Sequence, residues 1–332
     1  MLPLRLIAAC GLVLALAPPL RAQDAPERVS FYFAAHQDDW QLFMNPSAFA
    51  DVTDRKTKTV FVHLTAGDAG LGTGAGGRKH PYYLAREKGA ETAIHFMADS
   101  GDHPSGDQTT SAITLNGHRV YRASYRNTVT YFLRVPDGHP SGAGFQNTGY
   151  QSLERLARSD IAALSAVDGS TSYRGWPDLV ATVRALIDYE RGRARSVQLN
   201  VAEQDARINP NDHSDHRMTA KLALEAAAGL TCARRVYYVD YASARLPENL
   251  GPQDRDLESS VLAVTAAGIL AFDHTSIWHK YHRSYLGRNY FRVEEGAGPC
   301  RDPASAPLSA AVAAPQRTPA GSADKSTRPP RE

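Results

Sequence analysis

Residues 29–39 read VSFYFAAHQDD, an apolar run that leads directly into a histidine and two aspartates. The apolar part consists of β-branched, aromatic and small residues, which predicts a strand covered on both faces. In open α/β folds, ligands bind outside the carboxyl ends of the strands. A tight turn there can bring His36 and Asp39 to one metal ion, with Asp38 beside it as a general base. A surface turn closed by an aspartate would explain the same residues.

Residues 213–216 read HSDH and follow a second predicted strand, at residues 196–201, after a polar loop. His213 and His216 are three positions apart at the start of a predicted helix, so both imidazoles lie on one side of it. One can bind a metal ion while the other faces a substrate, and Asp215 can hydrogen-bond to an imidazole and fix its tautomer. A helix N-cap with solvent-facing histidines is the alternative for this motif alone. Because both motifs follow a strand, they are more informative together than separately.

The rest of the chain alternates strand-like and helix-like segments. Short runs rich in β-branched and aromatic residues predict strands at residues 29–34, 59–64, 129–134, 196–201 and 235–240. Apolar residues spaced by three and four predict helices at residues 82–98, 151–165, 176–191, 214–229 and 257–271. This alternation indicates an α/β fold, with a mostly parallel sheet and helices on both faces. Right-handed crossovers then place the carboxyl ends of all these strands at one edge of the sheet.

The composition is that of an ordinary globular protein. The chain has 332 residues, of which 42% are apolar and 22% charged, enough for one large domain or two modest ones. The formal net charge is only +2 and the sequence contains no block of basic residues, so we expect no nucleic-acid partner.

The two ends of the chain differ from the middle. Residues 1–22 combine Arg5 with an apolar run that two prolines interrupt, and they predict a cleaved signal peptide. The run is too short for a comfortable membrane span, so we expect export to the periplasm or the extracellular medium, with no membrane span after cleavage. Residues 23–300 then form the folded domain. Residues 301–332 are rich in Ala, Pro, Ser and Thr and predict a disordered tail.

Two further features concern the folded domain. Cys232 and Cys300 remain after cleavage, and they are either a disulfide in an oxidising compartment or two separate thiols. Residues 67–77, 100–111 and 136–150 are rich in Gly, Pro and Ser. Loops of this length inside a compact domain are usually binding loops or disordered excursions, and we expect these loops to set substrate selectivity.

The motifs resemble those of one known family. AHQDD at residues 35–39 resembles the AHPDD signature of the PIG-L/LmbE-like zinc-dependent N-acetylglucosaminyl deacetylases, and HSDH at 213–216 resembles their HPDH signature. Between the two, LTAGDAG at 64–70 resembles the family's LTxGdxG strand end, and ARE at 85–87 resembles its helical RE segment. The resemblance runs in the same order from about residue 29 to about residue 290. Gln37, Trp40 and Ser214 depart from the family pattern but are not proposed ligands.

The resemblance implies a Rossmann-like three-layer fold and the hydrolysis of an N-acyl amino sugar at a linear amide bond. Carried over by position, His36, Asp39 and His216 bind one zinc ion per chain. Asp38 is then the general base that activates water, and His213 is the acid or the oxyanion donor, with Asp215 orienting it.

Three residues are candidate substrate contacts, each with a structural alternative. Arg86 matches the family's helical arginine, or it forms an ion pair with Glu87 or a neighbour. Asp68 lines the rim of the site or caps a loop, and Trp40 stacks on a sugar ring or packs against the residues after it.

Other histidines give weaker signals. His63 lies on a predicted strand and is expected in the core. His274, His279 and His282 fall where the family often has a late polar residue, although a solvated helical face explains them too.

The leading hypothesis is an exported zinc amidohydrolase that removes an N-acetyl group from an amino sugar or a glycan. The alternative from another class is a non-catalytic carbohydrate-binding protein on the same scaffold, which would keep the cleft but would not need Asp38. The sequence predicts neither the individual substrate nor the oligomeric state.

Overall fold

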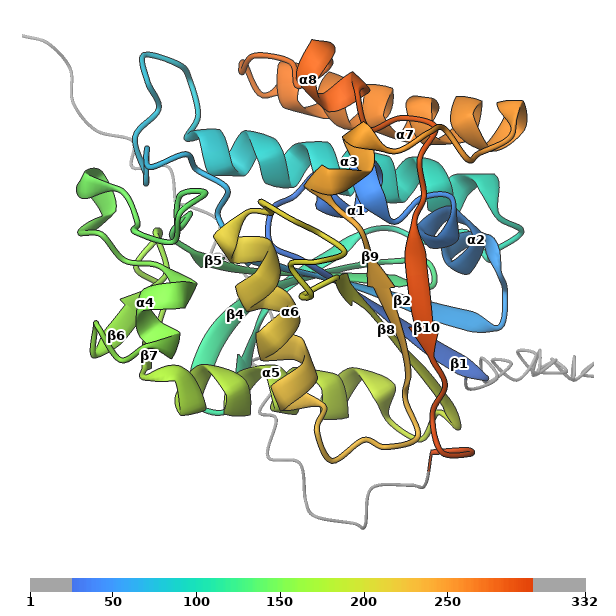
Figure 1. Ribbon diagram of the computed structural model, residues 1–332, viewed down its shortest axis with the longest axis horizontal. Helices are drawn as coiled ribbons and strands as arrows, with labels where there is room; N and C mark the ends of the chain where they lie inside the picture. The colour runs from blue at the N-terminus through green and yellow to red at the C-terminus, as the bar shows by residue number, and fades with distance from the viewer. Residues whose placement is uncertain (1–25, 301–332) are drawn as a thin grey trace, which may run out of the picture.

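The computed structural model describes residues 26–300. The predicted signal peptide and the predicted tail lie outside the described residues. Within them, an eight-stranded sheet in the order β10-β9-β8-β1-β2-β5-β4-β3 lies between two layers of helices (Figure 1). The five central strands, β9, β8, β1, β2 and β5, are parallel. Antiparallel strands extend both edges, with β10 beside β9 and with β4 and β3 beside β5. The predicted α/β class, with a mostly parallel sheet and helices on both faces, is confirmed.

The strands of this sheet are β1 (Arg28–Ala34), β2 (Thr57–Thr65), β3 (Thr109–Leu115), β4 (His118–Tyr125), β5 (Thr128–Val135), β8 (Ser196–Ala202), β9 (Arg234–Tyr238) and β10 (Phe291–Glu294). A separate hairpin consists of β6 (Ala163–Ser165) and β7 (Ser172–Arg174). The helices are α1 (Asp39–Phe43), α2 (Ser47–Thr53), α3 (Tyr82–Ser100), α4 (Leu153–Ala157), α5 (Trp176–Arg191), α6 (Ser214–Ala226), α7 (Pro252–Ala271) and α8 (Lys280–Arg283). Among the described residues, no helix has the length and apolar character needed to cross a membrane.

Strand β1 shows why the central strands are apolar at most positions. Phe31 and Phe33 pack into the core beneath α5 and α6, whereas Tyr32 and Ala34 pack into the core beneath α1, α3 and α7. Successive side chains of a strand point to opposite faces, so a strand covered on both sides needs apolar residues at nearly every position.

The order of the parallel strands determines where the site lies. Across the sheet, the five parallel strands lie in the order β5-β2-β1-β8-β9. If these five are numbered 1 to 5 along the chain, the order is 3-2-1-4-5, which is that of a Rossmann fold. The chain proceeds from β1 through β2 to β5 and then returns to the other side of β1 for β8 and β9. The crevice at this switch point, between β1 and β8, is where such folds bind their ligands. The two motifs follow these two strands.

The five predicted strands correspond to β1, β2, β5, β8 and β9, and the helix predicted at residues 176–191 matches α5. The single helix predicted at residues 151–165 is wrong. α4 ends at Ala157, and Ser159 then adopts a left-handed backbone before β6 begins. Residues 100–111, predicted as a loop, include the first residues of β3, whose mostly exposed side chains give no apolar run.

A disulfide joins Cys232 and Cys300, whose Cα atoms lie 5.1 Å apart. Of the two alternatives left open by the sequence, the structure has the paired one. The bond closes a loop that contains β9, α7, α8 and β10.

We expect the double variant Cys232→Ser/Cys300→Ser to lose about 2–4 kcal/mol of unfolding free energy, because the bond spans 68 residues and restricts the unfolded chain. Urea unfolding with and without reductant would measure this loss. Reductant should destabilise the wild type and leave the double variant unchanged. Equal stability of the two oxidised proteins would contradict the prediction.

Helices α3 and α7 approach each other backbone to backbone. A Cβ on Gly268 would lie 2.8 Å from Gly89 Cα, and a Cβ on Gly89 would lie 2.8 Å from the Thr265 carbonyl oxygen. Only glycine permits this separation without a shift of one helix. α3 also carries Arg86, so the contact helps to determine how far Arg86 reaches toward the switch point.

Gly268→Ala should therefore lower the unfolding free energy by about 1–3 kcal/mol, because the overpacking outweighs the gain in helix propensity. Gly106→Ala is the control, since a Cβ there meets no atom within 4 Å. Thermal or urea unfolding of both variants would measure the difference. A Gly268→Ala protein as stable as the wild type would show that the helices have room to separate.

Candidate active site

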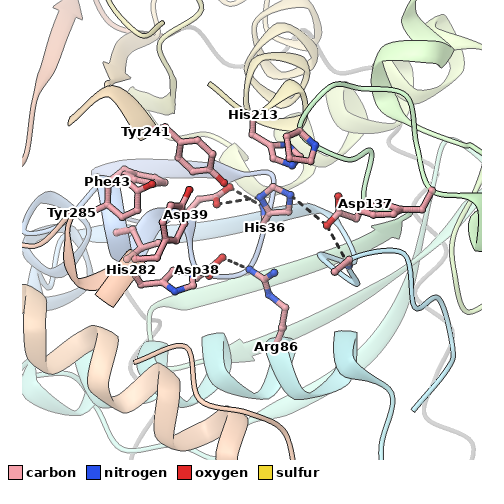
Figure 2. Close-up of a pocket in the computed structure, with 15 residues that line it drawn as sticks. His36, Asp38, Asp39, Phe43, Arg86, Asp137, His213, Tyr241, His282 and Tyr285 are labelled. Atoms are coloured by element: carbon pink, nitrogen blue, oxygen red, sulfur yellow. Dashed lines mark hydrogen bonds and ion pairs between the residues drawn. The ribbon is translucent and has the colours of Figure 1, made fainter. Parts of the chain in front are cut away.

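A cavity of about 230 Å³ opens at the carboxyl ends of the parallel strands, beside the switch point. Figure 2 shows His36 near its centre, with Phe43, Tyr241 and Tyr285 on one side and Asp137 on the other. Arg86 reaches toward Asp38 from α3, and His213 lies at the start of α6. The cavity thus collects side chains from both helical layers.

Three donor atoms of the two motifs converge on one point. His36 Nδ1 lies 3.2 Å from His216 Nε2 and 3.3 Å from Asp39 Oδ1, and His216 Nε2 lies 3.3 Å from the same Asp39 oxygen. A tetrahedral zinc ion with ligands at about 2.0–2.2 Å separates its ligand atoms by about 3.3 Å. These residues therefore fit one such ion, and three protein ligands leave a fourth position open, as in catalytic sites.

The turn after β1 holds this geometry. The backbone N–H of His36 donates to Asp39 Oδ2 at 2.8 Å, which closes the turn and leaves Oδ1 for the shared point. Asp39 is also the first residue of α1, so its position is fixed by the helix that follows. His216 lies in the first turn of α6.

Further carboxylates contact the other nitrogen of each ligand imidazole. His216 Nδ1 lies 2.9 Å from Asp212 Oδ1 and 3.1 Å from Asp240 Oδ2, while His36 Nε2 lies 3.6 Å from Asp215 Oδ2. The two contacts to His216 Nδ1 orient this imidazole and select the tautomer that faces the ion, whereas Asp215 approaches His36 without a hydrogen bond.

The buried negative charge also favours a cation. The second carboxylate oxygens of Asp212, Asp215 and Asp240 have no hydrogen-bond partner among the described residues. Burial and the neighbouring Asp212 carboxylate raise the pKa of Asp240 to about 7. Burial lowers the pKa of His36, but Asp39 and the other carboxylates outweigh it and raise that pKa to about 10. A metal ion would therefore bind in exchange for protons.

Asp38 lies between the side chains of Arg86 and His282. Its Oδ1 forms an ion pair with the Arg86 guanidinium, and its Oδ2 lies 3.3 Å from His282 Nε2 on α8. Burial raises the pKa of Asp38, but Arg86 and His282 outweigh it and hold that pKa well below its usual range. Asp38 is therefore an ionised hydrogen-bond acceptor at the edge of the cavity.

His213 is the N-cap of α6, and its Nδ1 accepts a hydrogen bond from the Asp215 backbone N–H at 3.1 Å. Burial and the neighbouring His36 and His216 lower the pKa of His213, so the ring is neutral. With Nδ1 as the acceptor, the proton is on Nε2. His213 lines the cavity as a neutral donor.

The carboxylate of Asp215 is not the group that orients His213. Asp215 Oδ2 lies 3.9 Å from His213 Nδ1, which is beyond hydrogen-bond distance. That oxygen instead accepts from the Gly138 backbone N–H at 2.7 Å and faces His36. Asp215 orients His213 only through its backbone N–H.

For two of the three candidate substrate contacts, Trp40 and Asp68, the structure has the structural alternative, because both side chains are fully buried. Trp40 packs against Phe61, with ring centroids 4.6 Å apart, and donates to His63 Nε2 at 3.1 Å. His63 is the core histidine that was predicted. Asp68 accepts from the backbone N–H groups of Gly72 and Asp137, and so ties two loops together.

Arg86 does line the cavity. It pairs with Asp38, as described above, and not with the adjacent Glu87, which pairs with Arg134. Of the three predicted binding loops, residues 67–77 and 136–150 supply cavity residues, among them Ala69, Asp137 and Phe145. No residue of 100–111 lines the cavity.

Sequence reasoning missed Asp137, Asp212 and Asp240. Asp137 and Asp240 each follow a parallel strand, β5 and β9, by two residues. The same strand-end rule that singled out His36 would have found both. His282, given only weak weight, is the late histidine that reaches the site.

No family model matches the chain, and no curated protein matches it. A solved structure of N,N'-diacetylchitobiose deacetylase from Pyrococcus horikoshii, with a bound inhibitor, is similar at a TM-score of 0.46 and 15% identity. The match covers 83% of this chain and 88% of that one. Likeness at this level does not establish family membership.

We expect the purified protein to bind one zinc ion per chain, and His216→Ala and Asp39→Ala to lose it, since each removes a donor of the triad. His95→Ala is the control, because His95 stacks on Tyr125 away from the cavity. Zinc affinity should fall as the pH falls, because protons compete for the imidazoles whose pKa is raised. Elemental analysis and chelator competition at several pH values would measure both effects. Full zinc content in His216→Ala would contradict this ligand set.

Proposed function

We propose that this protein is an exported, zinc-dependent amidohydrolase that removes an N-acetyl group from an amino sugar. The observation that carries the proposal is the convergence of the His36, Asp39 and His216 donor atoms, 3.2–3.3 Å apart, beside an ionised carboxylate and a neutral imidazole. The two motifs supply all of these groups. The proposal of export rests on residues 1–22 of the sequence alone.

In this proposal His36, Asp39 and His216 hold the metal ion. When bound, zinc supplies a Lewis acid that polarises an amide carbonyl and lowers the pKa of water to about 7, so that even a weak carboxylate base can take its proton. Asp212 and Asp240 keep the His216 imidazole oriented, and the Asp215 carboxylate lies 3.6 Å from His36 Nε2 as a nearby opposite charge.

Asp38 accepts the proton of the attacking water. Arg86 keeps it ionised, and together with His282 fixes the plane of its carboxylate. A carboxylate with a lowered pKa is a weak base but, once protonated, a strong acid. Asp38 therefore returns the proton readily to the departing amine, which must be protonated to leave.

His213 stabilises the negative charge that develops on the carbonyl oxygen. Its neutral ring presents Nε2–H to the cavity, and the backbone N–H of Asp215 fixes this tautomer. A preorganised donor of this kind is worth most in a buried site, where water does not compete.

The two sides of the cavity suit a sugar. Phe43, Tyr241 and Tyr285 form an aromatic side, while Arg86 and Asp137 provide charged groups on the remaining wall. A pyranose ring has apolar C–H faces and hydroxyl edges, which match these two kinds of surface. The solved structure that resembles this chain is likewise of a sugar deacetylase by its name.

The protein without its first 22 residues should release acetate from N-acetylglucosamine, its β-linked oligomers or peptidoglycan fragments, and a chelator should abolish the release until zinc is added. Asp38→Asn should lower kcat by about 10²–10⁴-fold while zinc stays bound, because proton transfer is lost. Asp102→Asn is the control, since that carboxylate is on the surface. Enzymatic acetate assay and zinc analysis would measure these effects.

Hydrolysis that persists in fully metal-free protein would overturn the proposal. Glycan binding with no acetate release, by protein that carries zinc, would favour the non-catalytic carbohydrate-binding alternative.

A further inference from the structure

The aromatic side of the cavity begins at the metal ligands. The Tyr241 ring lies 5.0 Å from the His216 ring, measured between centroids, and 5.9 Å from Tyr285 at an interplanar angle of 20°. Phe43 packs edge-on against Tyr285 at 5.0 Å. Phe43 and Tyr285 are buried, at 1% and 2% exposure, so this part of the wall is fixed by packing.

Tyr281 continues this wall to the surface. It lies on α8, lines the same cavity, and packs perpendicular to Tyr241 and Tyr285 with centroids 6.1 and 5.5 Å away. Unlike the buried rings behind it, Tyr281 is 50% exposed. An aromatic surface thus extends without a break from the metal ligands to solvent at the mouth of the cavity.

The volume of the cavity limits how much of a ligand it encloses. Pockets that bury a drug-sized ligand usually measure about 300–1,000 Å³. At about 230 Å³, this cavity is below that range and suits a single sugar unit. Any further unit of a glycan must lie outside, where the exposed ring of Tyr281 is the aromatic surface next to the buried wall.

We propose that Tyr281 stacks against the sugar unit next to the one being deacetylated, so that the protein selects N-acetylated oligosaccharides over single sugars. The proposal rests on the proposed deacetylase function and assigns it a subsite. Tyr285 and Tyr241 hold the Tyr281 ring in place before the substrate arrives, so little side-chain freedom is lost on binding.

The test compares kcat/KM for N-acetylglucosamine with kcat/KM for its β-linked dimer and trimer. In the wild type the oligomers should be preferred. Tyr281→Ala should reduce the ratio of trimer to monomer by about five- to tenfold, because one stacking contact is lost. Tyr281→Phe keeps the ring and should keep the ratio.

Phe291→Ala is the matched control, because Phe291 is 49% exposed and does not line the cavity. It should leave both rates unchanged. A wild type with no preference for oligomers, or a Tyr281→Ala protein with the wild-type ratio, would overturn the subsite while leaving the deacetylase function intact.

A binding measurement separates the two proposals. Calorimetric titration of the chelator-treated protein with the trimer does not depend on turnover. Tighter binding of the trimer than of the monomer, lost in Tyr281→Ala and kept in Tyr281→Phe, would support the subsite even if no acetate were released from any substrate. Equal binding by all three proteins would exclude it.

Discussion

The pairing of β1 with β8 is the contact on which the rest of the site depends. His36 and His216 are 180 residues apart in the chain, yet their ring nitrogens lie 3.2 Å apart because each histidine follows one of these two neighbouring strands. Hydrogen bonds along the strands fix the register, with Phe31 opposite Leu199 and Tyr32 opposite Asn200. A slip of one residue would turn every side chain of β1 to the other face and bury the wrong set. The packing of the core thus sets the distance between the metal ligands.

The second constraint is charge. Asp39, Asp212, Asp215 and Asp240 are buried around the two imidazoles, and each uncompensated buried charge costs several kcal/mol in a protein interior. Protonated imidazoles offset part of this cost without a metal, as the raised pKa of His36 indicates. A divalent cation offsets more of it and does so at the point where the donors converge. A cluster of buried carboxylates is unfavourable in a protein core but suits a bound cation. Functional sites commonly break the rules of core composition in this way.

The sequence predicted those parts of the fold and site that depend on local pattern. β1 is recognisable because it is apolar at most positions, and the motifs because several ligand-type residues lie within four positions. Asp137 and Asp240 are single acids with no such spacing, so they are identified only by their place after β5 and β9. Phe43, Tyr241, Tyr281 and Tyr285 form the aromatic wall. They come from three separate segments of the chain, and no periodicity in the sequence connects them. Trp40 and Asp68 lie beside motif residues, but adjacency in sequence does not place a side chain in the cavity. Their neighbours face the site while they face the core.

The site is supported from both sides of the sheet, and the two sides have different tasks. α6, in one layer, carries His213 and His216, which together with His36 and Asp39 surround the point where the donors converge. α3 and α8, in the other layer, carry Arg86 and His282, which hold Asp38. Tyr281, one residue before His282, faces solvent at the mouth of the cavity. The short helix α8 thus carries both His282, which contacts the proposed base Asp38, and Tyr281, which is proposed to stack on the neighbouring sugar. The segment around α8 can therefore change substrate preference through Tyr281 while the ligand triad, which belongs to the turn after β1 and to α6, keeps its geometry.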